Sequence, residues 1–313
     1  MLKINHHLSL SKKLISLDYY FNEMINLFDS GKFPKVLLLS GKKGIGKFTL
    51  TFHFLNYIYS KKDEFSYNTQ DKIINTNSIF YNSILNQSCT DVVLLQAEEG
   101  KNIKIDDIRS LKNVLSKSSL STNPRFTIID EVEFLNSNSV NALLKTLEEP
   151  SDDNYFILIN NQQADLIETI SSRCLKSNIY LNLQQQKKII DHLIASKKID
   201  LSIEKSQNLT PGLLLKYNEL SSKYKIDNND SISSKLYKLL HAYKKDKNKA
   251  LINMSIFLVD QFFYNLMKDN KTKIEFLLDL RLIIINNIND SILYNLNINS
   301  VLNTIEIKLK NVR

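Results

Sequence analysis

Hydrophobic residues in the first half of the chain follow two alternating patterns. Continuous apolar runs at 36–39, 126–129 and 155–159 are typical of strands that are buried on both faces of a parallel sheet. At 16–30, apolar residues recur instead at helical spacing, and Gly31 follows where a glycine commonly ends a helix. Strands that alternate with helices in this way predict an α/β fold with a parallel sheet.

The same pattern predicts one more strand and three more helices: a strand at 91–96, and helices at 105–116, at 140–149 and from a glycine-rich loop to residue 59. Asn136 or Ser137 can cap the helix at 140–149, and Pro150 ends it. Residues 60–88 are polar, and their role cannot be read from the pattern.

After about residue 180 the pattern changes, and no convincing buried strand follows. Helical spacing continues to residue 313, with a turn at 210–212 and no glycine or proline after Gly212. We therefore expect three domains: an α/β domain at 1–174, a small helical domain at 175–222 and an all-helical domain at 223–313.

Composition fits a soluble globular protein, because 43% of the 313 residues are hydrophobic and 24% are charged. The formal net charge of +8 is compatible with work near nucleic acid but is weak evidence alone. The start of the chain has scattered charges and no apolar core, so no export signal is expected. The apolar stretch 276–285 is too short and too charged to span a bilayer, and no membrane partner is expected.

The two cysteines, Cys89 and Cys174, are too few for a thiolate zinc site and form no Cys-x-x-Cys pair. We expect reduced thiols in a cytoplasmic protein, no zinc and no other structural metal.

The segment 41–47 matches the phosphate-loop pattern Gly-x-x-x-x-Gly-Lys between a strand and a helix. Its glycines, Gly41, Gly44 and Gly46, would let backbone N–H groups surround phosphate oxygens, and Lys47 would reach the outer phosphates. A magnesium-binding Ser or Thr is expected next, but the chain has Phe48. Thr49 lies about 100° further round the helix and is no simple substitute. A loop that binds nothing stays open as the alternative.

Asp130 and Glu131 follow the apolar strand at 126–129. In a phosphate-loop enzyme, such an Asp holds magnesium, and the adjacent Glu polarises the attacking water. Alone, the pair is more often an acidic strand end, but its place after a phosphate loop makes it a candidate catalytic pair.

Three blocks together resemble the AAA+ clamp-loader family of bacterial DNA polymerase III. They are the entry to the glycine loop at 30–41, the segment 139–150 that follows Asp130-Glu131, and the run Ser171-Ser172-Arg173-Cys174. The resemblance covers roughly residues 15–215. It implies an AAA+ domain, a helical lid domain and a C-terminal collar domain that oligomerises. It also implies that Arg173 acts in trans as an arginine finger in the ATP site of a neighbouring subunit.

Within this family, the chain looks most like the delta-prime type. ATP-hydrolysing gamma or tau subunits are expected to have Ser or Thr at position 48 and an arginine just after Pro211-Gly212, where this chain has Leu213. The implied partners are gamma or tau and delta subunits, the sliding clamp and, through the complex, primed DNA. The implied role in replication is clamp loading, with weak or absent ATPase activity of the chain itself.

Two alternatives stay open. The chain could be a gamma-like subunit that hydrolyses ATP with Lys47, Asp130 and Glu131, and ATP or ADP with Mg²⁺ is then its cofactor. A stand-alone AAA+ regulator that forms a homo-oligomer is the third interpretation, and the Ser-Arg-Cys block argues against it by resemblance.

Overall fold

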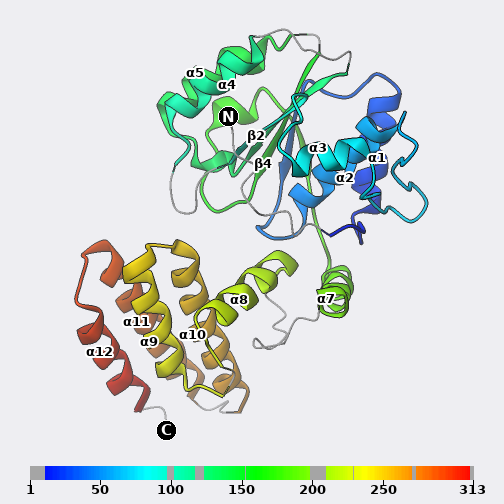
Figure 1. Ribbon diagram of the computed structural model, residues 1–313. Helices are drawn as coiled ribbons and strands as arrows, with labels where there is room; N and C mark the ends of the chain where they lie inside the picture. The colour runs from blue at the N-terminus through cyan, green and yellow to red at the C-terminus, as the bar shows by residue number, and fades with distance from the viewer. Residues whose placement is uncertain are drawn as a thin grey trace. The chain divides into compact units, whose positions relative to one another are not determined.

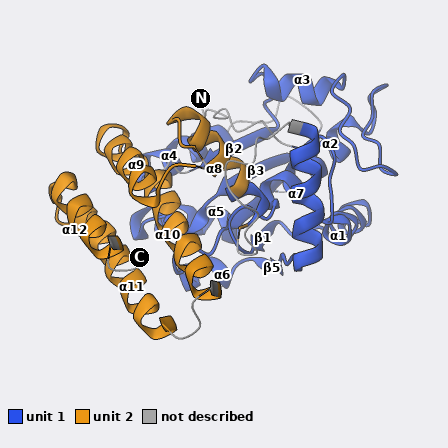
Figure 2. Cartoon of the chain, turned by 90° about the horizontal axis from the view of Figure 1, so that it is seen from below, with its two compact units in different colours: residues 1–198, 210–213 blue, residues 199–209, 214–313 orange. Residues whose placement is uncertain are grey.

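A computed structural model of the chain describes most of its residues, namely 11–96, 102–116, 123–151, 153–197, 209–227, 229–269 and 273–310. The chain forms two compact units, which are coloured separately in Figure 2: residues 1–198 with 210–213, and residues 199–209 with 214–313. The first unit carries the sheet, and the second is helical.

Five parallel strands form the sheet of the first unit (Figure 1). In chain order they are β1 (Val36–Ser40), β2 (Val92–Gln96), β3 (Arg125–Asp130), β4 (Asn154–Asn160) and β5 (Leu175–Asn178). Their spatial order is β2-β3-β4-β1-β5, and every neighbouring pair is parallel. Because the order reverses at β1, the carboxyl end of that strand is where a ligand site is expected in such a sheet.

Helices cover both faces of the sheet (Figure 1). On one face, Leu37 and Leu39 share a core with α1 (Asp18–Asp29), α2 (Lys47–Ser60) and α3 (Ile79–Leu85). On the other face, Val36 and Leu38 share a core with four helical elements: α4 (Ile105–Leu115), η1 (Val132–Phe134), α5 (Ser137–Glu148) and α6 (Glu168–Ser171). Every residue of β1 is buried, which explains why this strand has a continuous apolar sequence rather than an alternating one.

The predicted α/β parallel sheet is therefore confirmed, and the four predicted strands are all present. Asn136 is the cap of α5, since its side chain accepts a hydrogen bond from the Ser139 N–H at 2.8 Å. The prediction missed β5, which pairs with the other side of β1 and begins just after the expected domain boundary at 174. Three of the four β5 residues are exposed, so this strand has no buried apolar run to reveal it.

Segment 60–88, whose role the sequence pattern does not predict, contains turns and the short helix α3. Ser78 caps this helix by accepting a hydrogen bond from the Tyr81 N–H. An antiparallel bridge joins Ile73 to Lys13, and Ile74 N–H donates to the Lys12 carbonyl. The segment thus covers α2 and fastens the start of the described chain to the first unit.

Six helices complete the described chain: α7 (Leu183–Lys197), α8 (Pro211–Lys223), α9 (Ile232–Asp246), α10 (Lys249–Asp269), α11 (Ile274–Leu293) and α12 (Ile298–Lys310). Helices α9 to α12 of the second unit share one apolar core, in which Leu236, Val259, Phe263, Ile284 and Ile305 are buried. This part is all-helical, as predicted.

Among the described residues, one helix, α10, is long and apolar enough over 249–268 to cross a membrane by length and composition alone. Leu251, Met254 and Phe263 of this helix are fully buried in the second unit. A core helix passes the same test, so the observation is weak evidence for a membrane span.

Aromatic rings fill the core between the sheet and helices α1 and α2. Phe33 stacks on Phe54 with ring centroids 5.0 Å apart, and Phe126 stacks on Tyr155 at 5.2 Å. Phe28 contacts all four of these rings. Such contacts stabilise the fold by more than the buried area alone.

We expect Phe126→Ala to lower the free energy of unfolding of the first unit by about 3–5 kcal/mol, because it leaves a cavity inside this aromatic cluster. The exposed Phe65 is the control, and its replacement by Ala should cost less than about 1 kcal/mol. Urea unfolding followed by circular dichroism measures both. Equal losses for the two variants would contradict the assigned core.

Candidate functional site

The glycine loop leaves the carboxyl end of β1 and turns into α2 through backbone conformations that side chains disfavour. Gly44 has φ +82°, and an added Cβ would lie 2.5 Å from Thr210 Oγ1. At Gly41 an added Cβ would lie 2.5 Å from the carbonyl oxygen of Ile179, just after β5. The loop therefore needs glycine at these two positions for close approach of neighbouring chain segments.

Lys47 begins α2 and is buried against the glycine loop itself. Its Nζ donates to the carbonyl oxygens of Gly41 at 2.7 Å and Lys42 at 2.8 Å. Burial lowers the pKa of Lys47 to about 8, although Asp130 and Glu133 nearby favour its charged form. In this arrangement the ammonium binds loop carbonyls, which are not the phosphate oxygens that the sequence motif predicts.

Phe48 and Thr49 follow in the first turn of α2. Phe48 is half-buried and packs against the core that α1, α2 and α3 share with the sheet. A ring in that position contributes packing, whereas magnesium requires an oxygen ligand. Phe48 therefore does not supply the magnesium ligand that the motif places at this position.

The start of α8 lies directly on the glycine loop. The Gly212 N–H donates to the Gly44 carbonyl oxygen at 2.7 Å, and Thr210 Oγ1 donates to the Lys43 carbonyl oxygen at 2.7 Å. Residues 210–213 belong to the same compact unit as the sheet. These hydrogen bonds join the loop to a segment about 170 residues further along the chain.

Asp130, at the end of β3, is buried in a hydrogen-bond network. Its Oδ1 accepts from Asn161 Nδ2 at 3.2 Å and from the Glu131 N–H at 2.9 Å, and its Oδ2 accepts from Gln96 Nε2 at 3.3 Å. Burial, reinforced by the negative charge of Glu131, raises the pKa of Asp130 to about 6.

Glu131 has a left-handed backbone, with φ +59°, and its carboxylate forms an ion pair with the glycine loop. Lys43 Nζ lies 2.6 Å from Glu131 Oε1 and 2.9 Å from Gln163 Oε1. The carboxylate that the motif assigns to activating a water is thus paired with a loop cation.

Two further groups of this site were missed from the sequence. Glu133 is buried, and both of its carboxylate oxygens accept from the Asn161 N–H, at 3.0 and 3.1 Å. Asn161 therefore bridges Glu133 and Asp130. The signal in the sequence was the third acidic residue of Asp-Glu-Val-Glu at 130–133, which the motif alone does not explain.

Arg173 lies between α6 and β5, and its guanidinium is held by α5 and α6. Its Nε donates to Glu148 Oε1 at 2.6 Å, Nη2 lies 2.5 Å from the same oxygen, and Nη1 donates to the Thr169 carbonyl oxygen at 2.8 Å. The side chain is 32% exposed, so the guanidinium still reaches solvent.

Arg173 and the glycine loop lie at opposite edges of the sheet. Leu175, two residues after Arg173, pairs with Leu37 near the start of β1, whereas the loop follows Ser40 at its end. At about 3.3 Å per residue, the strand alone separates these edges by roughly 10 Å. The structure therefore brings Gly41, Gly44, Gly46, Lys47, Asp130 and Glu131 to one edge and leaves Arg173 apart from them.

The neighbours of Arg173 are ordinary surface and core residues. Ser171 and Ser172 donate their hydroxyls to the carbonyls of Glu168 and Thr169. Burial raises the pKa of the Cys174 thiol to about 11 and also raises that of Cys89, so neither is an activated nucleophile. Within the described ranges, no three His, Cys, Asp or Glu side chains gather to hold a metal ion, and the expectation about zinc stays a prediction.

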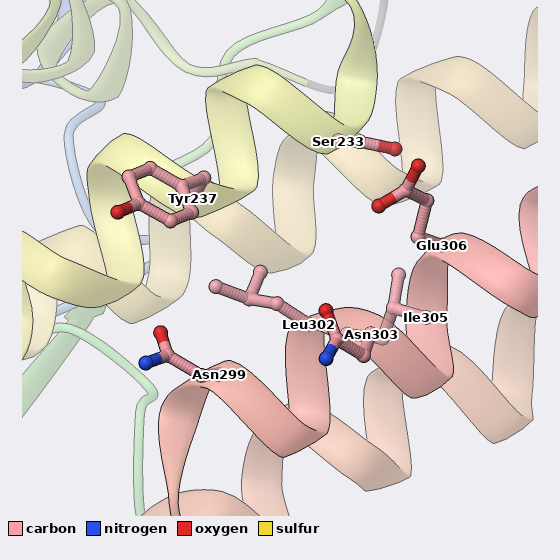
Figure 3. A pocket seen from close by; sticks show the side chains of 7 residues that line it. All are labelled: Ser233, Tyr237, Asn299, Leu302, Asn303, Ile305 and Glu306. Carbon is pink, nitrogen blue, oxygen red and sulfur yellow. The ribbon is translucent and has the colours of Figure 1, made fainter.

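A separate cavity of about 380 Å³ lies in the helical unit between α9 and α12 (Figure 3). Its lining mixes polar and apolar side chains with a single carboxylate: Ser233, Tyr237, Asn299, Leu302, Asn303, Ile305 and Glu306. None of the predicted site residues belongs to this cavity.

A parallel sheet whose first strand enters a Gly-x-x-x-x-Gly-Lys loop, and whose third strand ends in Asp-Glu, defines a phosphate-loop protein with the AAA+ fold. Residues 18–182 match the model of the family described as "DNA polymerase III, delta subunit". The match covers more than half of the chain, so the chain belongs to this family, and the clamp-loader resemblance is confirmed.

Curated relatives include both kinds of subunit. The gamma subunit of Buchnera aphidicola subsp. Schizaphis graminum is 30% identical over 58% of this chain and 47% of its own length. The delta' subunit of the same organism is 27% identical over 73% of this chain and 66% of its own length, and that of Bacillus subtilis is 31% identical over 49% and 46%. The chain spans about half the length of the gamma relatives that it matches, and both names occur among its relatives.

We expect Asp130→Asn to stabilise the protein at neutral pH. Because folding raises the pKa of Asp130 above its ordinary value of 3.8, the folded state binds a proton more tightly. The stability from this group is present at low pH and is lost as the pH rises through about 6. The free energy of unfolding of the variant, relative to that of the native protein, should rise by about 1–3 kcal/mol between pH 4 and pH 7.

Urea unfolding across that pH range measures the difference. The exposed Asp165→Asn is the matched control and should show no such growth. A stability difference for Asp130→Asn that stays constant with pH would contradict the buried, destabilised carboxylate.

Proposed function

We propose that the chain is a delta-prime-type subunit of the clamp loader, which lends Arg173 to the ATP site of a neighbouring gamma-type subunit. One observation carries this proposal: Arg173 lies at the edge of the sheet opposite to the glycine loop of its own chain. A guanidinium at that edge can serve a nucleotide only on another chain.

The role of Arg173 in trans is electrostatic. Charge develops on the γ-phosphate oxygens during hydrolysis, and a planar guanidinium offsets it through paired N–H groups. Arginines supplied in this way are worth roughly 10³- to 10⁵-fold in rate. The chain would thereby control hydrolysis at its neighbour without performing the reaction.

Three features support weak or absent ATPase activity at the chain's own loop. Phe48 packs in the core where a magnesium ligand is needed, and Lys43 pairs with Glu131. The third feature is that Lys47 Nζ, which would have to reach phosphate, donates to the carbonyl oxygens of Gly41 and Lys42. Each feature competes with a group that nucleotide or magnesium would have to contact.

The helical unit offers a surface suited to subunit assembly. On α11, Leu278 and Leu282 are 40% and 51% exposed and lie four residues apart, so they share one helix face. Phe276 and Ile283, which are 50% and 40% exposed, lie seven residues apart on a different face of the same helix. We propose that residues 223–313 form the collar domain and that the lid, expected at 175–222, begins only after β5, which belongs to the sheet. We propose gamma or tau and delta subunits as the partners.

In this proposal, the assembly opens the sliding clamp and places it on primed DNA in the cytoplasm. The chain's part is structural and trans-catalytic. Its net charge of +8 favours proximity to DNA, although the contacts with DNA would be made through the complex.

A gamma-like ATPase is the second candidate. The intact Asp130-Glu131 pair and Lys47, together with the gamma relative at 30% identity, favour it. It predicts that the purified chain hydrolyses ATP and that Lys47→Ala abolishes this activity. The delta-prime proposal predicts that the isolated chain does not hydrolyse ATP.

We expect Arg173→Ala to slow single-turnover ATP hydrolysis at the neighbouring site of the complete assembly by at least 10³-fold. The assembly contains the chain, its gamma and delta partners, the clamp and primed DNA. Arg109→Ala is the matched control, since Arg109 is exposed on α4 and forms an ion pair with Asp106 on the same helix. Unchanged turnover with Arg173→Ala would reject the proposal.

We expect Leu282→Asp to weaken assembly at least tenfold in Kd, because it puts a charge into an apolar interface. Leu85→Asp, at an exposed leucine on α3, should leave assembly unchanged. Analytical ultracentrifugation of the mixed subunits measures both. Identical assembly of the two variants would show that α11 is not the interface.

A further inference from the structure

We infer that Glu148 is a positioning residue for Arg173, and this inference rests on the proposed function. Glu148 is the last residue of α5, and Arg173 follows α6. The two side chains meet across 25 residues of sequence, with Arg173 Nε 2.6 Å from Glu148 Oε1. Nothing in the sequence motif assigns a partner to the arginine.

The contacts fix which edge of the guanidinium is bound and which is left available. Nε and Nη2 face the Glu148 carboxylate, and Nη1 donates to the Thr169 carbonyl oxygen and, at 3.3 Å, to the Ser172 hydroxyl. A guanidinium has five N–H groups, so these four contacts leave one N–H, on Nη2 at the tip of the side chain, for a further acceptor. The tip is the part that would meet phosphate oxygens across an interface.

These contacts lower the entropic cost of ordering the Arg173 guanidinium when it enters the neighbouring ATP site. A free arginine side chain samples many rotamers, and each must be lost when it docks. The Glu148 carboxylate and the Thr169 carbonyl come from different helices, so together they fix the plane of the guanidinium. Misplacing a charge-stabilising group by about 1 Å is enough to cost up to roughly 10²-fold in rate.

Helix α5 gives this contact a rigid base. Its first turn is capped by Asn136 and anchored by Ser139, whose hydroxyl donates to the Ile103 carbonyl oxygen at 2.9 Å. Val140, Leu143 and Leu147 are buried against the sheet. The carboxylate at the end of such a helix has little freedom to drift, although an exposed ion pair of this kind adds little to stability.

The test uses the complete assembly and single-turnover ATP hydrolysis. We expect Glu148→Ala to lower the rate about tenfold with the KM for ATP unchanged, because the neighbour's nucleotide-binding residues are intact. Glu149→Ala is the matched control at the adjacent exposed carboxylate and should leave the rate unchanged. Glu148→Gln, which keeps an oxygen acceptor, should recover part of the rate and covers the case in which the alanine variant folds poorly.

The double variant Glu148→Ala with Arg173→Ala separates positioning from a general structural role. If Glu148 acts through Arg173, the double variant is no slower than Arg173→Ala alone. Additive losses, no loss with Glu148→Ala, or a faster rate with it would each overturn the inference. No loss with Arg173→Ala itself would instead overturn the proposed function, so the two failures are distinguishable.

Discussion

The ammonium of Lys43 lies 2.6 Å from Glu131 Oε1, and this ion pair closes the glycine loop onto the end of β3. Two other contacts tighten the same loop, since Lys47 binds its carbonyls and the Gly212 N–H binds Gly44. These contacts engage carbonyl oxygens of the loop and the ammonium groups of Lys43 and Lys47. A phosphate is bound in such a loop by backbone N–H groups and the lysine, so it would have to draw the Lys47 ammonium away from the Gly41 and Lys42 carbonyl oxygens.

The residues of the phosphate-loop motif and Arg173 lie at opposite ends of the strands of one sheet. At the carboxyl edge, the predicted nucleotide residues are present but engaged with one another. At the other edge, Arg173 is partly exposed and held by Glu148. Helix α5 begins shortly after Asp130 and Glu131 and ends at Glu148, so it spans the distance between the two edges. The proposed action of Arg173 on a neighbouring subunit requires this separation.

Much of this arrangement could be predicted from the sequence, because buried parallel strands and glycine loops are local patterns. The runs at 36–39 and 126–129, the loop at 41–47 and the Asn136 cap all follow from neighbouring residues. Strand β5 could not be found, since it is short, exposed and held only by its pairing with β1. The contacts Lys43–Glu131 and Thr210–Lys43 join residues 88 and 167 positions apart, which no local pattern encodes. Arg173 stood out only through the Ser-Arg-Cys resemblance.

The most direct measurement is a calorimetric titration of Mg-ATP into the isolated chain, native and with Lys47→Ala. Because Lys47 is held by loop carbonyl oxygens and Phe48 stands where a magnesium ligand is needed, we predict no saturable binding below about 1 mM for either protein. Micromolar, magnesium-dependent binding that Lys47→Ala abolishes would contradict it, and would show that the chain uses its own loop as a nucleotide site.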